Sequence, residues 1–284
     1  MGISAADVKA LREKTGAGMM ECKNALVATD GDFAGAEKLL KEKGLAAVEK
    51  RSDRATNEGK IFVRIRDDGN LAVLVELASE TDFVDRNPEF IALGDLIAGR
   101  VLEKGYTGPN DELNGLVTDL ATKIRENMSL KRIRVLQAGR GEYLTRYIHG
   151  DGNIGVVVKI GTDKPEVLAN EDFKAFAFTI ALHIAAFNPL ALDQSRVDPA
   201  FLAEQEEIFR KQMEGDEKLM AKPANVIDGI LKGKVKKYLA DICLLDQGYV
   251  KDEKITVAQA LADCGKQLGA KLSVIDYVYF KVGQ

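Results

Sequence analysis

The sequence contains few of the residues that perform covalent or metal chemistry. It has two histidines and three cysteines among 284 residues. Cys22, Cys243 and Cys264 are widely spaced, and none belongs to a C-x-x-C pair or to a His-Cys pattern typical of zinc sites. A reducing cytoplasm suits three such cysteines better than a disulfide scaffold does. The sequence therefore predicts a cytoplasmic protein with no catalytic residue, no metal ligand and no cofactor.

Long apolar runs and a strong charge imbalance are also missing. No run approaches the roughly 18 apolar residues that a membrane-spanning helix needs, and Met1 to Ser4 lack the apolar core of a signal peptide. The net charge of −4 gives no overall attraction to nucleic acid. We expect an ordinary globular protein of two or more compact units, with no membrane partner and no direct contact with nucleic acid.

Three further candidates for chemistry have simple structural explanations. His183 lies in a very apolar helical stretch, which favours a buried core histidine over a base or a ligand. The basic run from Lys131 to Arg134 could bind phosphate, but its alternation within a strand favours a solvated face. Cys22 lies on a helical face and is expected to be a small buried apolar residue.

Residues 1–50 are predicted to form a small domain of three helices. The expected helices run from about Ser4 to the break at Thr15–Gly18, from Met19 to about Thr29, and from Phe33 to a stop at Gly44. In the second of these, Met20 has the spacing of the apolar face. Because fewer than 50 residues bury only a marginal core, we expect this unit to lean on the rest of the chain.

An internal repeat organises the middle of the chain. Asp68-Gly69-Asn70 recurs 83 residues later as Asp151-Gly152-Asn153, and each copy lies between two strand-like runs. Asp-Gly and Gly-Asn between strands favour a β-hairpin. The same offset places Phe90 over Phe173. We therefore predict an α+β fold whose core is two related subdomains with antiparallel sheets, each a hairpin followed by a helix.

The repeat also suggests the domain boundaries. We assign the first core subdomain to residues 51–139 and the second to residues 140–196 and 241–284, with a last strand at Leu272–Val282. Residues 197–240 interrupt the second copy with two amphipathic helical patterns. They predict an inserted antiparallel helical hairpin that projects from the core, and two helices packed on the core are the alternative.

The tetrapeptide Thr81-Asp82-Phe83-Val84 is the most informative candidate for a binding site. It follows a strong strand signal and places a carboxylate and a large aromatic at the mouth of a loop. A Phe on a loop can fill a partner's pocket, and an adjacent Asp can disturb a metal or phosphate site across an interface. The alternative is a strand end whose last apolar residue packs under the next helix. The second copy has Lys164-Pro165-Glu166-Val167 at this place, which favours a function for the first.

Several segments of the sequence resemble motifs of a known family. The segments Leu11–Leu26, Glu80–Val84 and His183–Ala186, together with Pro189, are similar to motifs of elongation factor Ts of bacterial type. The resemblance runs in order from about residue 4 to residue 283. It implies a small N-terminal domain similar to ubiquitin-associated domains, a two-part core and a helical hairpin. It also implies a guanine-nucleotide exchange factor that acts on elongation factor Tu and is not an enzyme.

The same resemblance implies which residues contact the partner. Residues matching Arg12, Met19 and Met20 touch the GTPase domain of the partner, as does the pair matching Asp82 and Phe83. We expect the flanking residues Thr81 and Val84 to be partner-binding as well. His149 belongs to the second subdomain, which meets the third domain of the GTPase. We expect Phe83 to act as a wedge and Asp82 to disturb the magnesium and phosphate site. Several relatives continue into a C-terminal helix that packs on the partner, whereas this sequence stops at Gln284.

Two other classes of function stay open at this stage. A scaffold protein could bind another chain through the three-helix unit without promoting exchange. An enzyme could use Asp82 or His149, although no partner residues surround either in the sequence. The helical hairpin and the core are also candidate surfaces for self-association.

Overall fold

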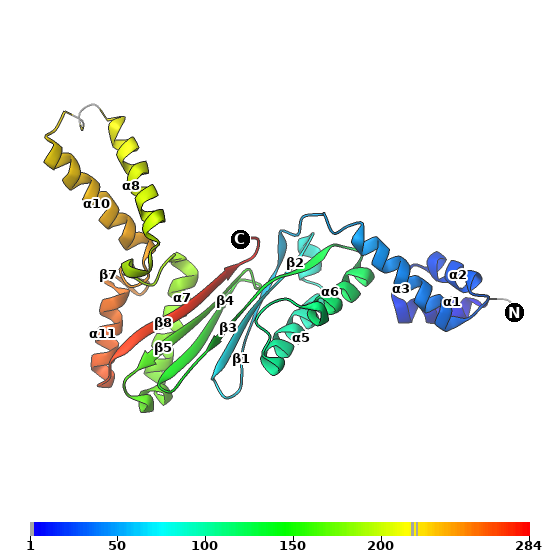
Figure 1. The fold of residues 1–284 in the computed structure, drawn as a ribbon. Helices are drawn as coiled ribbons and strands as arrows, with labels where there is room; N and C mark the ends of the chain where they lie inside the picture. Colours follow the sequence, from blue (N-terminus) through cyan, green and yellow to red (C-terminus); the bar gives the residue numbers. More distant parts are fainter. Residues whose placement is uncertain (1–2, 217–218, 220) are drawn as a thin grey trace.

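Two antiparallel three-stranded sheets form the centre of the molecule in a computed structural model that describes residues 3–216, 219 and 221–284 (Figure 1). The first sheet has the order β1-β2-β3, with strands Glu58–Ile65, Leu71–Ser79 and Met128–Gln137. The second has the order β4-β5-β8, with strands Glu142–His149, Ile154–Thr162 and Leu272–Lys281. We call the two sheets with their covering helices the first and second halves of the core. The fold is α+β, as predicted.

The sheets pack face to face, and helices cover their outer faces. Ile61, Leu74, Val157 and Phe280 belong to the buried cluster between the sheets. The first sheet is covered by α5 (Pro88–Lys104) and α6 (Asp111–Ile124), and the second by α7 (Glu171–Phe187) and α11 (Val257–Leu268). The central strands β2 and β5 are therefore buried on both faces, which explains their nearly unbroken apolar sequence.

The internal repeat predicted from the sequence is confirmed in the strand register and in the helices. Lys60 pairs with Leu77 across β1 and β2, and Tyr143 pairs with Ile160 across β4 and β5, with the same offset. The helices α5 and α7 each have 17 residues and begin at corresponding positions. Their aromatic residues Phe90 and Phe173 are fully buried, each in the outer core of its own half.

The second half carries an insertion that the first half lacks. The helices α8 (Pro199–Glu214) and α10 (Ala224–Ile242) lie side by side and extend away from the sheets in Figure 1. Residues 217, 218 and 220 of the predicted hairpin lie outside the described residues. After α10 comes a two-stranded sheet, β6 (Gly248–Tyr249) and β7 (Asp252–Thr256), which the sequence pattern did not predict.

His183 of α7 is a core histidine with both ring nitrogens bonded, as predicted. It is fully buried, and the Val250 backbone N–H donates to its Nδ1 at 3.2 Å. Its Nε2 therefore carries the hydrogen and donates to Gln247 Oε1 at 3.0 Å. The Gln247 amide in turn donates to the Asp241 carbonyl at the end of α10. Burial lowers the pKa of His183, so this network holds a neutral imidazole at the root of the insertion.

The N-terminal helices are α1 (Ala5–Thr15), α2 (Met19–Ala28) and α3 (Phe33–Glu49). Cys22 is fully buried in their shared core, as expected. Two expectations were wrong. Met20 is 63% exposed, because the apolar face of α2 is formed by other residues. The third helix does not stop at Gly44 but continues to Glu49. The glycine serves a close helix contact instead, because a Cβ at this position would lie 2.2 Å from Thr122 Cγ2 of α6.

Neither a membrane span nor a metal cluster is found in the described part of the chain. None of its helices is both long enough and apolar enough to cross a bilayer. Within residues 3–216, 219 and 221–284, no group of three or more His, Cys, Asp or Glu side chains could hold a metal ion.

Candidate functional site

The tetrapeptide singled out in the sequence forms a one-turn helix, α4 (Asp82–Asp85), directly after β2, and not an open loop. Phe83 is 80% exposed, whereas Val84 is 4% exposed and belongs to the core of the first half. The apolar residue that packs under the next helix is therefore Val84. Its buried side chain anchors the turn to this core. Phe83 points outward, which excludes the alternative in which it is a core residue.

Polar contacts fix the start of the turn. Thr81 Oγ1 donates to both carboxylate oxygens of Glu126, at 3.0 and 3.1 Å. The Ser79 hydroxyl donates to the Thr81 carbonyl at 3.1 Å. Asp82 pairs with Arg86 one turn later at 3.2 Å, and both side chains remain largely in solvent. The Asp82 carboxylate is thus oriented and still accessible, next to an exposed phenyl ring.

Three consecutive residues after α6 connect this turn to the N-terminal helices. Arg125 caps α6 in a left-handed conformation with φ 70° and pairs with Glu21 of α2. Glu126 holds Thr81, as described above. The third residue is Asn127, whose backbone N–H donates to Glu80 Oε1 at 2.6 Å. Its side-chain amide donates to the carbonyls of Ser52 at 3.1 Å and Arg54 at 2.7 Å. The sequence pattern does not predict this connection, because these contacts join positions far apart in the chain.

The predicted contact residues of the N-terminal helices are all at the surface. Arg12 lies exposed in the last turn of α1. Met19 and Met20 form the first turn of α2, and both are exposed, with Met20 the more so. Flexible thioether side chains adapt to irregular apolar surfaces, which makes them suited to contact with a second protein.

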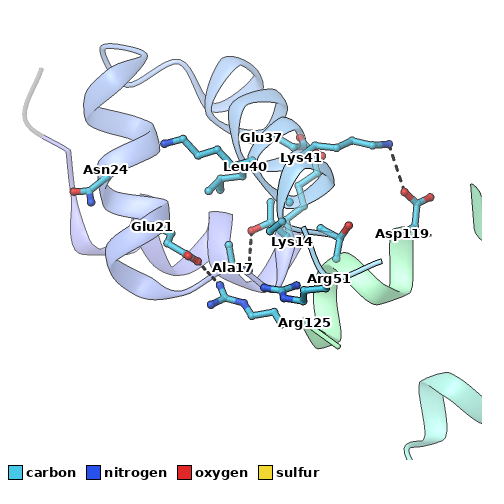
Figure 2. Close-up of a pocket in the computed structure, with 15 residues that line it drawn as sticks. Lys14, Ala17, Glu21, Asn24, Glu37, Leu40, Lys41, Arg51, Asp119 and Arg125 are labelled. Carbon is cyan, nitrogen blue, oxygen red and sulfur yellow. Dashed lines mark hydrogen bonds and ion pairs between the residues drawn. The ribbon is translucent and has the colours of Figure 1, made fainter. Parts of the chain in front are cut away.

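A groove of about 400 Å³ lies between the N-terminal helices and α6 (Figure 2). Two ion pairs cross it, Glu21 with Arg125 and Lys41 with Asp119 at 3.7 Å. Exposed pairs of this kind each contribute at most about 1 kcal/mol. None of the predicted contact residues lines the groove. We interpret it as the seam where the N-terminal helices meet the core.

His149 is the last residue of β4 and is exposed. Its Nδ1 lies 3.1 Å from the Tyr147 hydroxyl. The β4–β5 turn that follows is bonded to the other half of the core, since the Ile61 backbone N–H of β1 donates to the Gly152 carbonyl at 2.8 Å. Strand β1 also packs against α4. The structure therefore brings the turn after His149 close to the turn that carries Phe83.

Comparisons with known proteins give one consistent family. The family model described as Elongation factor TS matches residues 80–284. Elongation factor Ts of Treponema denticola is 49% identical over 283 residues, covering 100% of this chain and 99% of the relative. That of Borrelia hermsii is 38% identical with full coverage of both, and that of Clostridium acetobutylicum is 37% identical, covering 99% and 93%. The chain belongs to the elongation factor Ts family.

Membership of the elongation factor Ts family confirms the resemblance seen in the sequence and implies a nucleotide exchange factor of translation elongation. The relatives extend over the N-terminal helices as well as over the region that the family model matches. Arg12, Met19 and Met20 therefore lie within the shared length, together with Phe83 and His149.

Proposed function

We propose that this protein binds elongation factor Tu, promotes GDP release by disturbing the magnesium and phosphate site, and so supports translation elongation in the cytoplasm. Family membership supports the general activity. The observation that carries the mechanism is the contrast at α4, where Phe83 is 80% exposed and Val84 is 4% exposed. An aromatic residue on an anchored turn loses little conformational entropy when it enters a partner's pocket.

Exchange of this kind needs binding and no bond-making residue. A factor that binds the nucleotide-free GTPase more tightly than the GDP-bound form must, by linkage, weaken nucleotide binding by the same amount. Accelerating release by about 10⁴ requires lowering its barrier by about 5.5 kcal/mol, at about 1.36 kcal/mol per decade. We assign this to contacts made by surface residues, so the protein acts as a binding factor and not as an enzyme.

We assign a role to each proposed contact residue. Phe83 acts as a wedge into the GTPase, and Asp82 beside it acts on the magnesium site. Mg²⁺ demands near-ideal octahedral geometry, so a small displacement of its ligands weakens the nucleotide. Met19 and Met20 grip the GTPase domain together with the exposed, cationic Arg12.

His149 provides a second contact from the other half of the core. The bond between the Ile61 N–H and the Gly152 carbonyl ties its turn to the strand that packs against α4. We therefore propose that the partner meets Phe83 and His149 as two points of one fixed surface.

We further propose that the domain boundaries follow the sequence division. Residues 1–50 would form a domain similar to ubiquitin-associated domains, with α1, α2 and α3 around their own buried cluster. Residues 197–240 would form the helical hairpin, and the remaining segments the two core subdomains.

Size-exclusion chromatography with elongation factor Tu tests the proposal. The two proteins should co-elute without nucleotide and separate when GDP and magnesium are added. Release of fluorescent GDP from the GTPase should accelerate in proportion to the added factor. Co-elution that is insensitive to nucleotide, with no faster release, would leave a scaffold and contradict exchange.

A further inference from the structure

Two charged residues are buried beneath the turn that carries Phe83. Lys60 of β1 is 8% exposed, and Asp85 at the end of α4 is 7% exposed. Burying a charged group costs free energy unless other groups compensate it. Most charged side chains on this core lie at the surface, so the position of these two calls for an explanation.

The second half of the core has apolar residues at the same two places. The register of the β-hairpins makes Tyr143 the counterpart of Lys60. The strands before the turn, β2 and β5, have the same offset in sequence as the helices after it, α5 and α7. Leu168 is therefore the counterpart of Asp85. Tyr143 and Leu168 both pack against the hydrophobic cluster of the second half. The turn can therefore be built without any buried charge.

The contacts of Lys60 join the two halves of the core. Its ammonium donates to the carbonyl of Asp151, in the β4–β5 turn that follows His149. The neighbouring backbone bond from Ile61 to Gly152 holds the same turn at 2.8 Å. A Cβ on Gly152 would lie 3.3 Å from Lys60 Cγ, so the turn fits closely over the lysine stem. Lys60 thus fixes the turn of one half against a strand of the other.

Asp85 faces this junction from the α4 side. Among residues 3–216, 219 and 221–284, no donor lies within hydrogen-bond distance of its Oδ1, and Arg86 Nε is 3.9 Å away. Burial raises the pKa of the Asp85 carboxyl, while the Lys60 ammonium acts on it through space in the opposite direction. The Asp85 carboxyl and the Lys60 ammonium are thus both buried where α4 packs on β1, and no direct ion pair joins them.

Stability alone does not account for such a buried pair. Replacing buried charges by apolar residues of similar volume is often neutral or stabilising, and buried polar groups are best attested as devices that fix one arrangement. The second half shows that apolar residues suffice here. Lys60 and Asp85 stand where the turn of Phe83, strand β1 and the turn after His149 meet.

We propose that Lys60 and Asp85 are positioning residues for nucleotide exchange, which hold the Phe83 turn and the turn after His149 in the mutual orientation that the partner GTPase recognises. This inference rests on the proposed function. It assigns a role to two residues that do not themselves touch the partner.

The first test replaces both charges by apolar residues of similar size. The variant Lys60→Met with Asp85→Leu reproduces the apolar character of Tyr143 and Leu168, so its melting temperature should equal or exceed that of the wild type. Its maximal rate of GDP release should fall about tenfold, since small misplacements of a contacting group are costly. The apparent KM for GDP-bound elongation factor Tu should change less than about threefold.

A second variant set separates positioning from a general effect. Adding the pair substitution to Phe83→Ala should reduce the rate by a smaller factor than in the wild type, because part of the effect of the pair passes through the placement of Phe83. Glu166→Gln, in the corresponding turn of the second half, is the matched control and should exchange at the wild-type rate. The single variant Asp85→Asn should show an intermediate rate.

The outcomes distinguish this inference from the proposed function. If wild-type protein accelerates GDP release and Phe83→Ala does not, exchange through Phe83 stands. The positioning role alone would then be overturned if the pair variant exchanged within about twofold of the wild type. It would also be overturned if the pair substitution slowed Phe83→Ala by the same factor as it slows the wild type. If wild-type protein fails to accelerate release, the proposed function and this inference fall together.

Discussion

The turn after the second strand buries a valine in both halves of the core but presents different side chains to solvent. It is a one-turn α-helix in the first half and a 3-10 helix, Pro165–Ala169, in the second. Val84 and Val167 occupy corresponding positions, and both are buried. The residues before them, Phe83 and Glu166, are both exposed. The shared valine fixes the backbone, and the exposed residue is free to differ. In a repeat of this kind, the fold constrains the buried residue, whereas the exposed residue can differ with the function of each copy.

The largest effect is expected at the two exposed residues, Phe83 and Glu166, because only the first should matter for GDP release. Phe83→Ala should reduce acceleration of GDP release by about 30-fold, because truncating a buried interface anchor costs about 2 kcal/mol or more. The melting temperature should stay close to that of the wild type, because the ring is in solvent in the free protein. Asp82→Ala should give a milder loss.

Glu166→Ala is the matched change in the second half and should leave both measurements unchanged. Thermal melting and release of fluorescent GDP, run on the same preparations, check the pair. A Phe83→Ala protein that melts far below the wild type, or that exchanges as fast, would remove the functional difference between the turns.

The next effect should be equal in both halves. Val84→Ala and Val167→Ala each remove two buried methyl groups, which should lower the free energy of unfolding by about 1.5 kcal/mol, at about 0.8 kcal/mol per group. Urea unfolding measures this loss. If only one of the two variants is destabilised, the valines do not have the same structural role.

A smaller effect, confined to acidic pH, is expected in the second half alone. The pKa of His183 is lowered by burial in the folded protein, so the unfolded chain binds the proton first as the pH falls below about 6.5. Stability should therefore be fully present above this pH and decline as the pH falls toward the folded pKa.

His183→Gln removes the titrating group and should flatten this decline. Chemical denaturation from pH 7.5 to pH 5 compares the two proteins. An equally steep decline in the variant would assign the pH dependence to other groups.

The smallest effect concerns the inserted helices. Replacing residues 206–234 by a short flexible linker keeps the buried cluster at the base, which includes Leu239 and Cys243. The core should melt cooperatively near the wild-type temperature and retain most of its exchange activity. Loss of the cooperative transition would show that the outer part of α8 and α10 belongs to the core.

The sequence allowed the parts of the fold that local chemistry specifies to be predicted. Asp-Gly-Asn turns between apolar runs specify the two hairpins, and the offset of Phe90 and Phe173 relates the helices. Gly44 shows the limit of this reasoning. A glycine late in a helix suits a C-cap and equally suits a close approach, and only the position of Thr122 decides between them.

The candidate site was likewise predicted in part. Phe83 was predicted as exposed because its copy in the repeat is a different residue. The links from Arg125, Glu126 and Asn127 were not predicted, since they join a helix end to a strand end and to the N-terminal helices. The buried pair Lys60 and Asp85 could not be predicted either, because neither the strand pattern of β1 nor the sequence of a one-turn helix indicates which residues of the other half pack against it.

The unbroken helix α3 has a consequence for how a partner is held. Its 17 residues extend about 25 Å, at about 1.5 Å per residue, from the N-terminal helices toward the core. A flexible linker from Gly44 onward would let Met20 and Phe83 search for their sites independently. If the partner contacts both residues, as proposed, an unbroken α3 that packs against Thr122 of α6 would present them as a bivalent ligand of fixed spacing. On this proposal, forming one contact would raise the effective concentration of the other, so two modest contacts would combine into tight binding.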